Sequence, residues 1–145
     1  MADHRGGRRI EHEVAIAAPP ERVWRALVEP VEAGRWAGGT VTLAPSPDGA
    51  VRFDWGEQGA VDGRVVALDP PRHLVMDWDG YPDPGTTRVA FALAPDGAGT
   101  AVSLVHSGYG DGVAWDGFFD GEATGWVDLL DALRRVVESG DHERR

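Results

Sequence analysis

The stretch from Gly112 to Ser139 constrains the fold more than any other part of the chain, because it is the longest run with a helical period. Large apolar residues recur in it at spacings of three and four, which places them on one side of an α-helix. No proline follows Pro95, so nothing in the sequence forces a break in such a helix. The apolar residues are Trp115, Phe118, Phe119, Trp126, Leu129, Leu130, Leu133, Val136 and Val137. The pattern predicts a long amphipathic helix late in the chain.

Three glycines spaced four residues apart, Gly117, Gly121 and Gly125, lie inside this stretch. Each costs a helix about 1 kcal/mol relative to alanine, so helices normally avoid them. One interpretation is a glycine-rich loop followed by a shorter helix. The other is a single long helix whose bare strip lets a sheet or a ligand come close. The apolar phase continues across the glycines, which favours the single helix.

Composition excludes several classes of protein. The 145 residues suggest one domain, large enough to bury roughly 70% of its unfolded surface. Cysteine is absent, which removes disulfides, thiol nucleophiles and cysteine metal ligands. No apolar run reaches the roughly 18 residues that a membrane span needs. The net charge is −10, and an acidic body repels phosphate. We therefore predict a cytoplasmic protein without a membrane span or a nucleic-acid partner.

The order of the predicted elements indicates the fold class. Residues 1–9 are predicted as a disordered basic tail, residues 10–140 as a single domain, and residues 141–145 as a second disordered tail. In the domain, a half-buried strand ends before Pro19 and is followed by one or two short helices. About six alternating runs come next, separated by turn sequences rich in Pro, Asp and Gly. The predicted fold is α+β, an antiparallel meander of about six or seven strands covered by the long helix.

Several segments in a fixed order resemble a known family. They are residues 18–27 with a small-Pro pair and a Val-Trp helix, Trp36, the hairpin sequences 63–66 and 70–75 with Trp78, and the closing sequences 99–100, 106–109, 125–126 and 129–133. Together they span about residues 10–138 and resemble the SRPBCC (START-like, Bet v-like) superfamily. Within it, the chain is similar to bacterial homologues of the activator of the ninety-kilodalton heat-shock chaperone ATPase.

The resemblance implies a helix-grip fold, in which a strongly bent antiparallel sheet wraps around the C-terminal helix and leaves a cavity between them. The superfamily hosts lipid carriers, hormone receptors, polyketide cyclases, antibiotic-resistance proteins and chaperone partners, so function must be argued from the site. The chain departs from a common family pattern at Ala37, which follows Trp36 where many relatives have a second aromatic residue. This departure predicts a wider or more open pocket mouth.

Aromatic and apolar side chains on the inner face, with two polar residues among them, are the candidates for lining the cavity. These candidate ligand-binding residues are Trp36, Phe53, Trp55, Met76, Trp78, Phe91, His106, Phe118, Glu122 and Trp126. Simple core packing explains most of the aromatic residues, and a ligand-lined cavity explains some of them. Our first hypothesis is a carrier, sequestering or resistance protein that binds a small, mostly hydrophobic molecule.

Three residues give a second hypothesis, an acid–base cyclase, dehydratase or hydrolase. His106, Glu122 and Tyr109 are the candidate catalytic groups. The alternatives are a structural histidine, a carboxylate at a solvated pocket mouth, and a tyrosine that caps the turn before the helix. His12, on the apolar face of the first strand, is a weaker candidate. Of the two hypotheses, we favour the non-catalytic one.

Other motifs for chemistry are missing from the sequence. Ser103 and Ser107 lack a Gly-x-Ser-x-Gly context, the histidines show no metal-ligand spacing, and no phosphate-binding glycine loop is present. We therefore predict no metal and no cofactor. A third hypothesis, from the resemblance, is a module that binds a chaperone. A homodimer formed through a sheet edge or the short helices is left open.

Overall fold

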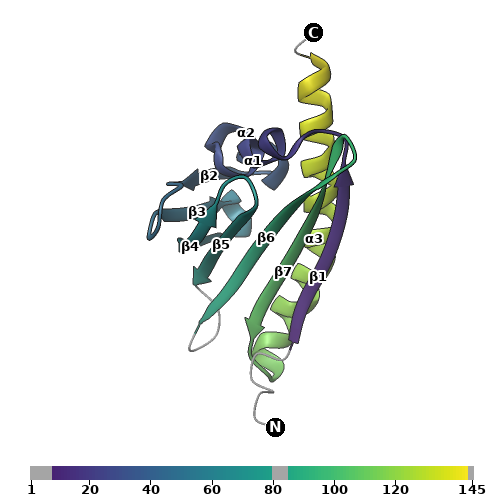
Figure 1. Cartoon of the computed structure of the whole chain (residues 1–145). Coiled ribbons are helices and arrows are strands. Elements are labelled where there is room, and N and C mark those ends of the chain that lie inside the picture. Colours follow the sequence, from purple (N-terminus) through teal and green to yellow (C-terminus); the bar gives the residue numbers. More distant parts are fainter. Residues whose placement is uncertain (1–7, 80–84, 144–145) are drawn as a thin grey trace.

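The computed structural model describes residues 8–79 and 85–143, which form a sheet and three α-helices (Figure 1). The strands are β1 Arg8–Ile16, β2 Thr40–Leu43, β3 Ala50–Asp54, β4 Ala60–Asp69, β5 His73–Asp79, β6 Thr86–Asp96 and β7 Gly99–Tyr109. The helices are α1 Pro20–Val28, α2 Pro30–Ala37 and α3 Val113–Glu143, and a short 3₁₀ turn spans Gly56–Gln58. The α+β class and the element order predicted from the sequence are confirmed.

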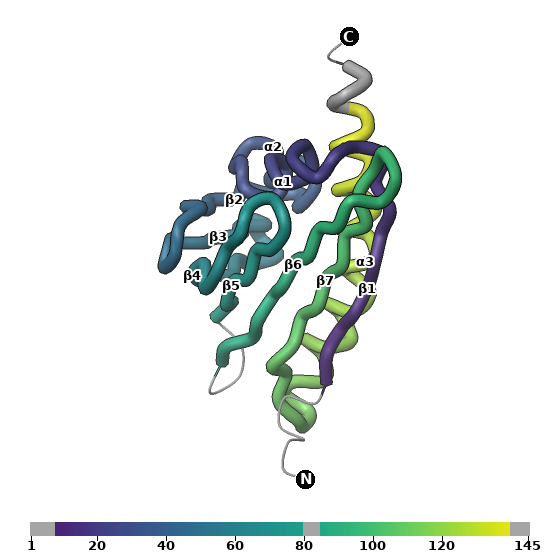
Figure 2. Tube along the Cα trace, viewed as in Figure 1, coloured from purple at the N-terminus to yellow at the C-terminus, as the bar shows by residue number. Residues whose placement is uncertain are grey.

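The sheet is one antiparallel meander in the order β1-β7-β6-β5-β4-β3-β2. β1 pairs with β7, so the first and last strands lie side by side. Figure 2 shows α3 running along these strands, with α1 and α2 beside one end of the sheet. A register shift between Val65 and Ala67 adds an extra residue to β4, and such bulges increase local twist and bending. This is the helix-grip arrangement that the resemblance implied.

α3 is a single helix that includes Gly117, Gly121 and Gly125. A Cβ built on any of these glycines meets no heavy atom within 4 Å beyond its own helix backbone and chain neighbours. The single-helix interpretation is therefore correct. The expectation that the strip brings the sheet close is wrong, because the strip faces open space.

The core lies between the inner face of the sheet and α3. From the helix, Trp126, Leu130 and Leu133 are buried, and from the sheet so are Val89 and Leu104. Burial alternates along β6 and β7, as expected when one face of a sheet packs against a helix. One apolar layer therefore joins the long helix to the strands.

The short helices are set by local sequence signals. Pro20 and Pro30 occupy first turns, where a missing backbone N–H costs nothing. Gly38 ends α2 in the left-handed conformation at φ 80°, which glycine adopts without strain. The Arg22 guanidinium donates to Glu32 at 2.7 Å and joins the two helices in a largely buried ion pair. These signals fix the end of α2, which later contacts the site.

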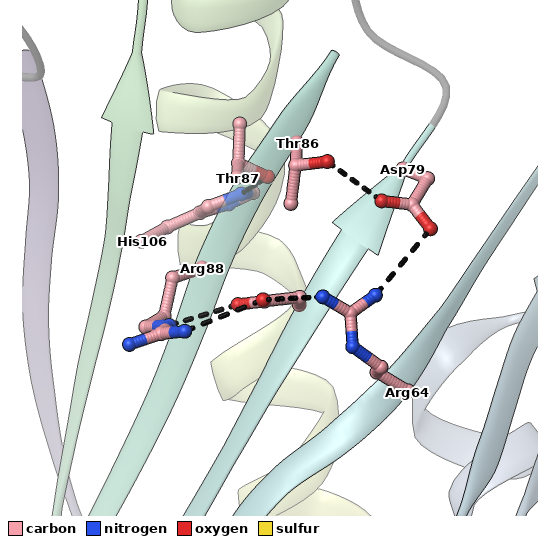
Figure 3. Close-up of polar contacts among 7 residues, drawn as sticks. Arg64, Asp79, Thr86, Thr87, Arg88 and His106 are labelled. Atoms are coloured by element: carbon pink, nitrogen blue, oxygen red, sulfur yellow. Dashed lines mark hydrogen bonds and ion pairs between the residues drawn. The ribbon is translucent and has the colours of Figure 1, made fainter. Parts of the chain in front are cut away.

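The outer face of the sheet carries a separate row of charges (Figure 3). Arg64, Asp77 and Arg88 are paired in register across three strands. Asp77 is only 6% exposed, and its carboxylate accepts from Arg88 Nε at 2.8 Å and from Arg64 Nη2 at 3.3 Å. The hydrogen bond to Asp77 raises the pKa of Arg88. These contacts tie β4, β5 and β6 together from outside the core.

The structure extends the domain slightly beyond the bounds expected from the sequence. Arg8 and Arg9 belong to β1, and Arg8 also donates to Asp116 at 2.8 Å, which anchors the strand to α3. α3 continues through Glu143, so part of the second predicted tail is helical. Residues 1–7 and 144–145 of the predicted tails lie outside the described residues. No helix in the described part of the chain has the length and apolarity to cross a membrane.

Candidate functional site

A pocket of about 530 Å³ lies between the sheet and α3. Its lining combines indoles, a bare stretch of helix and two polar side chains: Trp55, Gln58, Trp78, Gly121, Glu122, Gly125, Trp126 and Leu129. An adjoining hollow of about 290 Å³ shares Trp55, Gln58 and Glu122 with it. The two hollows therefore meet at a common wall.

The position of Trp55 comes from the end of α2. Trp55 directly follows β3, and its indole N–H donates to the Ala37 carbonyl at 2.9 Å. Ala37 is the residue at which the chain departs from the family pattern. Its small side chain is buried while its backbone carbonyl holds Trp55, so the end of α2 positions one aromatic residue of this pocket.

The position of Trp78 depends on a glycine in the neighbouring strand. Gly63 pairs with Trp78 across β4 and β5, and a Cβ on Gly63 would lie 1.7 Å from the Asp77 carbonyl oxygen. Only glycine tolerates this approach of two backbones. Trp126 from α3 stacks on Trp78 with ring centroids 5.8 Å apart and an interplanar angle of 21°. Trp55 packs edge-on against Trp78, with ring centroids 6.4 Å apart.

A buried chain of hydrogen bonds lies next to the indoles. His106 is fully buried, and its Nδ1 accepts from the Trp126 indole N–H at 2.9 Å. Its Nε2 lies 2.8 Å from the Thr87 hydroxyl (Figure 3). The Tyr109 hydroxyl lies 3.0 Å from His106 Nδ1 and donates to Glu122 Oε1. The chain therefore connects the sheet interior to a carboxylate that lines the pocket.

These contacts fix the tautomer of His106. An indole N–H can only donate, so Nδ1 must be the acceptor and the ring proton sits on Nε2, where it is donated to Thr87. Burial lowers the pKa of His106 to about 3, because desolvation penalises the charged ring. The imidazole is therefore neutral near pH 7 and holds Trp126 in place. With its Nδ1 lone pair taken by Trp126, Tyr109 is left to donate to Glu122.

A glycine bulge brings Tyr109 into this chain. Arg9 pairs with Ser107 and Arg8 with Tyr109, so Gly108 is skipped in the β1–β7 register. Gly108 has φ 91°, a conformation that other residues rarely adopt. Without the bulge, strict alternation would put Tyr109 on the face opposite His106. With it, both side chains point inward, and this is a geometry that simple period counting misses.

The structure distributes the ten candidate ligand-binding residues over three environments. Trp55, Trp78, Glu122 and Trp126 line the main pocket, and Phe118 lines the adjoining hollow together with Trp55 and Glu122. The other five are buried and line neither hollow: Trp36, Phe53, Met76, Phe91 and His106. Contact of any of the ten candidate residues with a ligand stays a prediction.

The candidate catalytic residues are brought together, but only one of them lines the pocket. The Tyr109 hydroxyl lies 3.0 Å from His106 Nδ1 and donates to Glu122, and of the three only Glu122 borders the open space. His12 lies elsewhere, with its Nε2 3.3 Å from the Ala123 carbonyl oxygen of α3. No three His, Asp or Glu side chains within residues 8–79 and 85–143 are grouped so that they could hold a metal ion.

Sequence reasoning did not identify several residues of the site. Gln58 and Leu129 line the pocket, and Thr87 accepts from His106. The glycine strip was visible in the sequence, but its role was left between packing and binding. The signal for Leu129 was its place in the helical period four residues after Gly125. Gln58 sits in a short turn and gave no signal.

Comparisons with known proteins agree with this architecture. The model of the family described as Activator of Hsp90 ATPase homolog 1-like protein matches residues 17–138. The search of curated proteins found no match.

Solved structures share the fold along most of this chain. Protein MLL2253 from Mesorhizobium loti has a TM-score of 0.81 at 25% identity, with 91% of this chain and 98% of that one covered. The Aha1 dimer from Colwellia psychrerythraea has a TM-score of 0.80 at 24% identity, with 90% and 96% covered. PFC0360w, an HSP90 activator from Plasmodium falciparum, has a TM-score of 0.77 at 15% identity, with 90% and 96% covered. The chain is thus a member of the Activator of Hsp90 ATPase homolog 1-like family within the SRPBCC superfamily.

Proposed function

We propose that this protein binds a small, mostly hydrophobic molecule in the pocket between the sheet and α3, as a carrier or sequestering protein. The observation that carries the proposal is the bare strip of α3. Gly121 and Gly125 line the pocket, and a Cβ on either meets no heavy atom within 4 Å. Packing does not require these glycines, and each costs the helix about 1 kcal/mol relative to alanine. Room for a ligand is a reason to keep them.

The chemistry of the walls supports the same proposal. Indoles offer a large contact area at little cost in side-chain entropy, and ligand pockets are typically apolar with a few polar groups. Trp78 is a wall residue, and its indole N–H has no hydrogen-bond partner within the described residues. An unpaired buried donor costs roughly 1–3 kcal/mol, which a ligand acceptor next to Trp78 would offset.

The proposal is tested with N-phenyl-1-naphthylamine, a neutral apolar fluorescent probe. We expect its emission to rise on binding, with energy transfer from the wall indoles. Gly125→Leu places a side chain in the pocket and should weaken binding at least tenfold. Gly117→Leu is the matched control, because Gly117 is on the same strip but lines neither hollow. Absence of binding to the wild type, or equal binding by both variants, would overturn the proposal.

An acid–base enzyme is less well supported by the geometry. Glu122 borders the pocket, but His106 and Tyr109 are fully buried behind it. A substrate in the pocket would therefore meet one of the three candidate groups. Turnover of a cyclisation, dehydration or hydrolysis substrate that is lost in Glu122→Gln would favour the enzyme instead.

Protein partners are the remaining part of the proposal. The family match supports a chaperone as one partner, and an Aha1 relative forms a dimer. The large hydrophobic side chains exposed among residues 8–79 and 85–143 are Val31, Val113, Phe118 and Val127. Phe118 and Val127 are nine residues apart and lie on opposite faces of α3. A pulldown that recovers no chaperone would argue against the chaperone partner, and sedimentation as a monomer would argue against the dimer.

The cytoplasmic location of the protein also stays a prediction.

A further inference from the structure

The pocket is acidic as well as aromatic. Glu122 lines both hollows, and Asp79 lines the smaller one. Neither hollow has an arginine or a histidine among its lining residues within the described chain. The sequence contains no lysine and carries a net charge of −10, and Arg64, whose Nη1 lies 4.0 Å from Asp79, offsets part of the charge of that one carboxylate. An anionic ligand would enter this space against the field, whereas a cation would be drawn in.

The hydrogen-bond chain behind Glu122 ends in a donor to its carboxylate. His106 Nδ1 already accepts from Trp126 at 2.9 Å, so the Tyr109 hydroxyl proton is directed to Glu122 Oε1. A hydrogen bond donated to a carboxylate stabilises the negative charge. The polar chain therefore positions the Glu122 carboxylate in the wall of the pocket.

The indoles supply the second element of a cation site. Trp55, Trp78 and Trp126 all line the pocket, and consecutive ring centroids are 6.4 Å and 5.8 Å apart. Indole has the strongest cation–π attraction of the aromatic side chains. Phe118 adds a further ring to the adjoining hollow and is 42% exposed. Aromatic rings and one carboxylate that line the same pocket match an ammonium group on an apolar body.

We propose that the pocket selects organic cations: apolar molecules that carry a protonated amine or quaternary ammonium group, with the charge held between the Glu122 carboxylate and the indoles. The inference rests on the proposed function, since it names the class of molecule that the pocket takes. The apolar body lies along the Gly121–Gly125 strip and Leu129, and the charged end lies toward Glu122 and Gln58.

The test compares three probes on one skeleton: 1-naphthylmethylamine as the cation, 1-naphthylmethanol as the neutral analogue and 1-naphthoate as the anion. Their affinities for the wild type are measured by titration calorimetry at pH 7.5 and low salt. We expect the amine to bind about tenfold tighter than the alcohol, from combined charge and cation–π attraction, and the naphthoate to bind most weakly. Raising the salt concentration should reduce the advantage of the amine.

Two variants test whether the Glu122 carboxylate causes the difference in affinity between the amine and the alcohol. Glu122→Gln keeps an acceptor for Tyr109 and should remove the advantage of the amine over the alcohol. Asp120→Asn makes the same change in net charge two residues away on α3, at a position that lines neither hollow, and should preserve the amine's advantage.

Each outcome separates the two proposals. Equal binding of amine and alcohol to the wild type would overturn the cation inference and leave the hydrophobic pocket standing. An equal loss in both variants would also overturn it, because the effect would then be one of overall charge. If none of the naphthyl probes and no N-phenyl-1-naphthylamine binds, the proposed function itself fails. If Glu122→Gln does not fold, the wild-type probe series still decides.

Discussion

At the scale of single residues, His106 organises the site without reaching the pocket. Each ring nitrogen has a defined role, because Nδ1 accepts from Trp126 and Nε2 donates to Thr87. A charged ring could not accept from an indole N–H, so the neutral form is built into the packing. The orientation of Trp126 depends on this one neutral side chain, whose ring also packs against Tyr109, the donor to Glu122.

The depressed pKa of His106 gives a pH prediction. Because burial lowers it to about 3 in the folded protein, the unfolded chain takes up a proton first as the pH falls below about 6.5. The contribution to stability is therefore complete above that pH and is lost as the pH falls toward 3. From this group alone we expect the free energy of unfolding to fall by about 2 kcal/mol between pH 7 and pH 5.

The direct measurement is a proton NMR titration of the histidine ring signals between pH 7.5 and pH 4.5. His106 should keep its neutral chemical shifts throughout. His73, whose side chain is 59% exposed, provides the ring signals of a solvent-accessible histidine for comparison. A His106 midpoint near 6 would contradict both the tautomer and the closed hydrogen-bond chain.

At the scale of elements, α3 has two structural roles: it packs against the sheet and it lines the pocket. Trp126, Leu130 and Leu133 close the core, whereas Gly117, Gly121 and Gly125 present backbone to open space. A soluble helix gains from side chains at such positions, so the strip sacrifices helix stability. That sacrifice is local, since the buried residues hold the helix to the sheet.

Alanine substitutions on the strip should stabilise the protein. Gly117→Ala and Gly121→Ala should each raise the free energy of unfolding by up to about 1 kcal/mol, because alanine loses less entropy and no neighbour obstructs the new methyl group. Thermal unfolding followed by circular dichroism gives the comparison. Destabilisation by Gly121→Ala would mean that the strip is packed after all. Only Gly121→Ala should also weaken N-phenyl-1-naphthylamine binding.

At the scale of the whole molecule, sheet and helices share one core. Leu133 from α3 and Leu104 from β7 are fully buried in it, and the short helices add Val23 and Trp36. Because the layers are joined by the same contacts, we expect the described fold to unfold in one cooperative step. The pocket occupies only part of the interface between helix and sheet, so the residues that line it are supported by the packed core.

Truncation of a core side chain tests that cooperativity. Leu133→Ala should lower the free energy of unfolding by about 2–5 kcal/mol, the usual cost of a buried cavity. Val127→Ala, on the same helix but 52% exposed, is the control and should cost far less. Urea denaturation measures both. A shifted midpoint with an unchanged m-value is the expected result, and a changed m-value for Leu133→Ala would speak against a single cooperative core.

Periodicity predicted the architecture well, because burial follows it directly. Alternation along β6 and β7 and the apolar stripe of α3 identified the inner faces, and His106 was placed on the correct one. Periodicity could not tell Phe91, which packs in the core, from Trp78, which lines the pocket. Both point inward, and the difference depends on how closely the layers approach. The bulge at Gly108 is likewise a register event that alternation does not encode.

The bare wall of α3 also bears on how such a pocket changes over evolution. A glycine codon becomes an alanine codon by a single-nucleotide substitution, and at Gly121 or Gly125 the added methyl group meets no neighbour. Each such step subtracts one methyl volume from the pocket while strengthening the helix. Ligand preference can therefore shift in small increments. No other mutation is needed beforehand to compensate for lost stability. In most binding sites a mutation that changes specificity also lowers stability. At Gly121 and Gly125 a change in specificity need not lower stability.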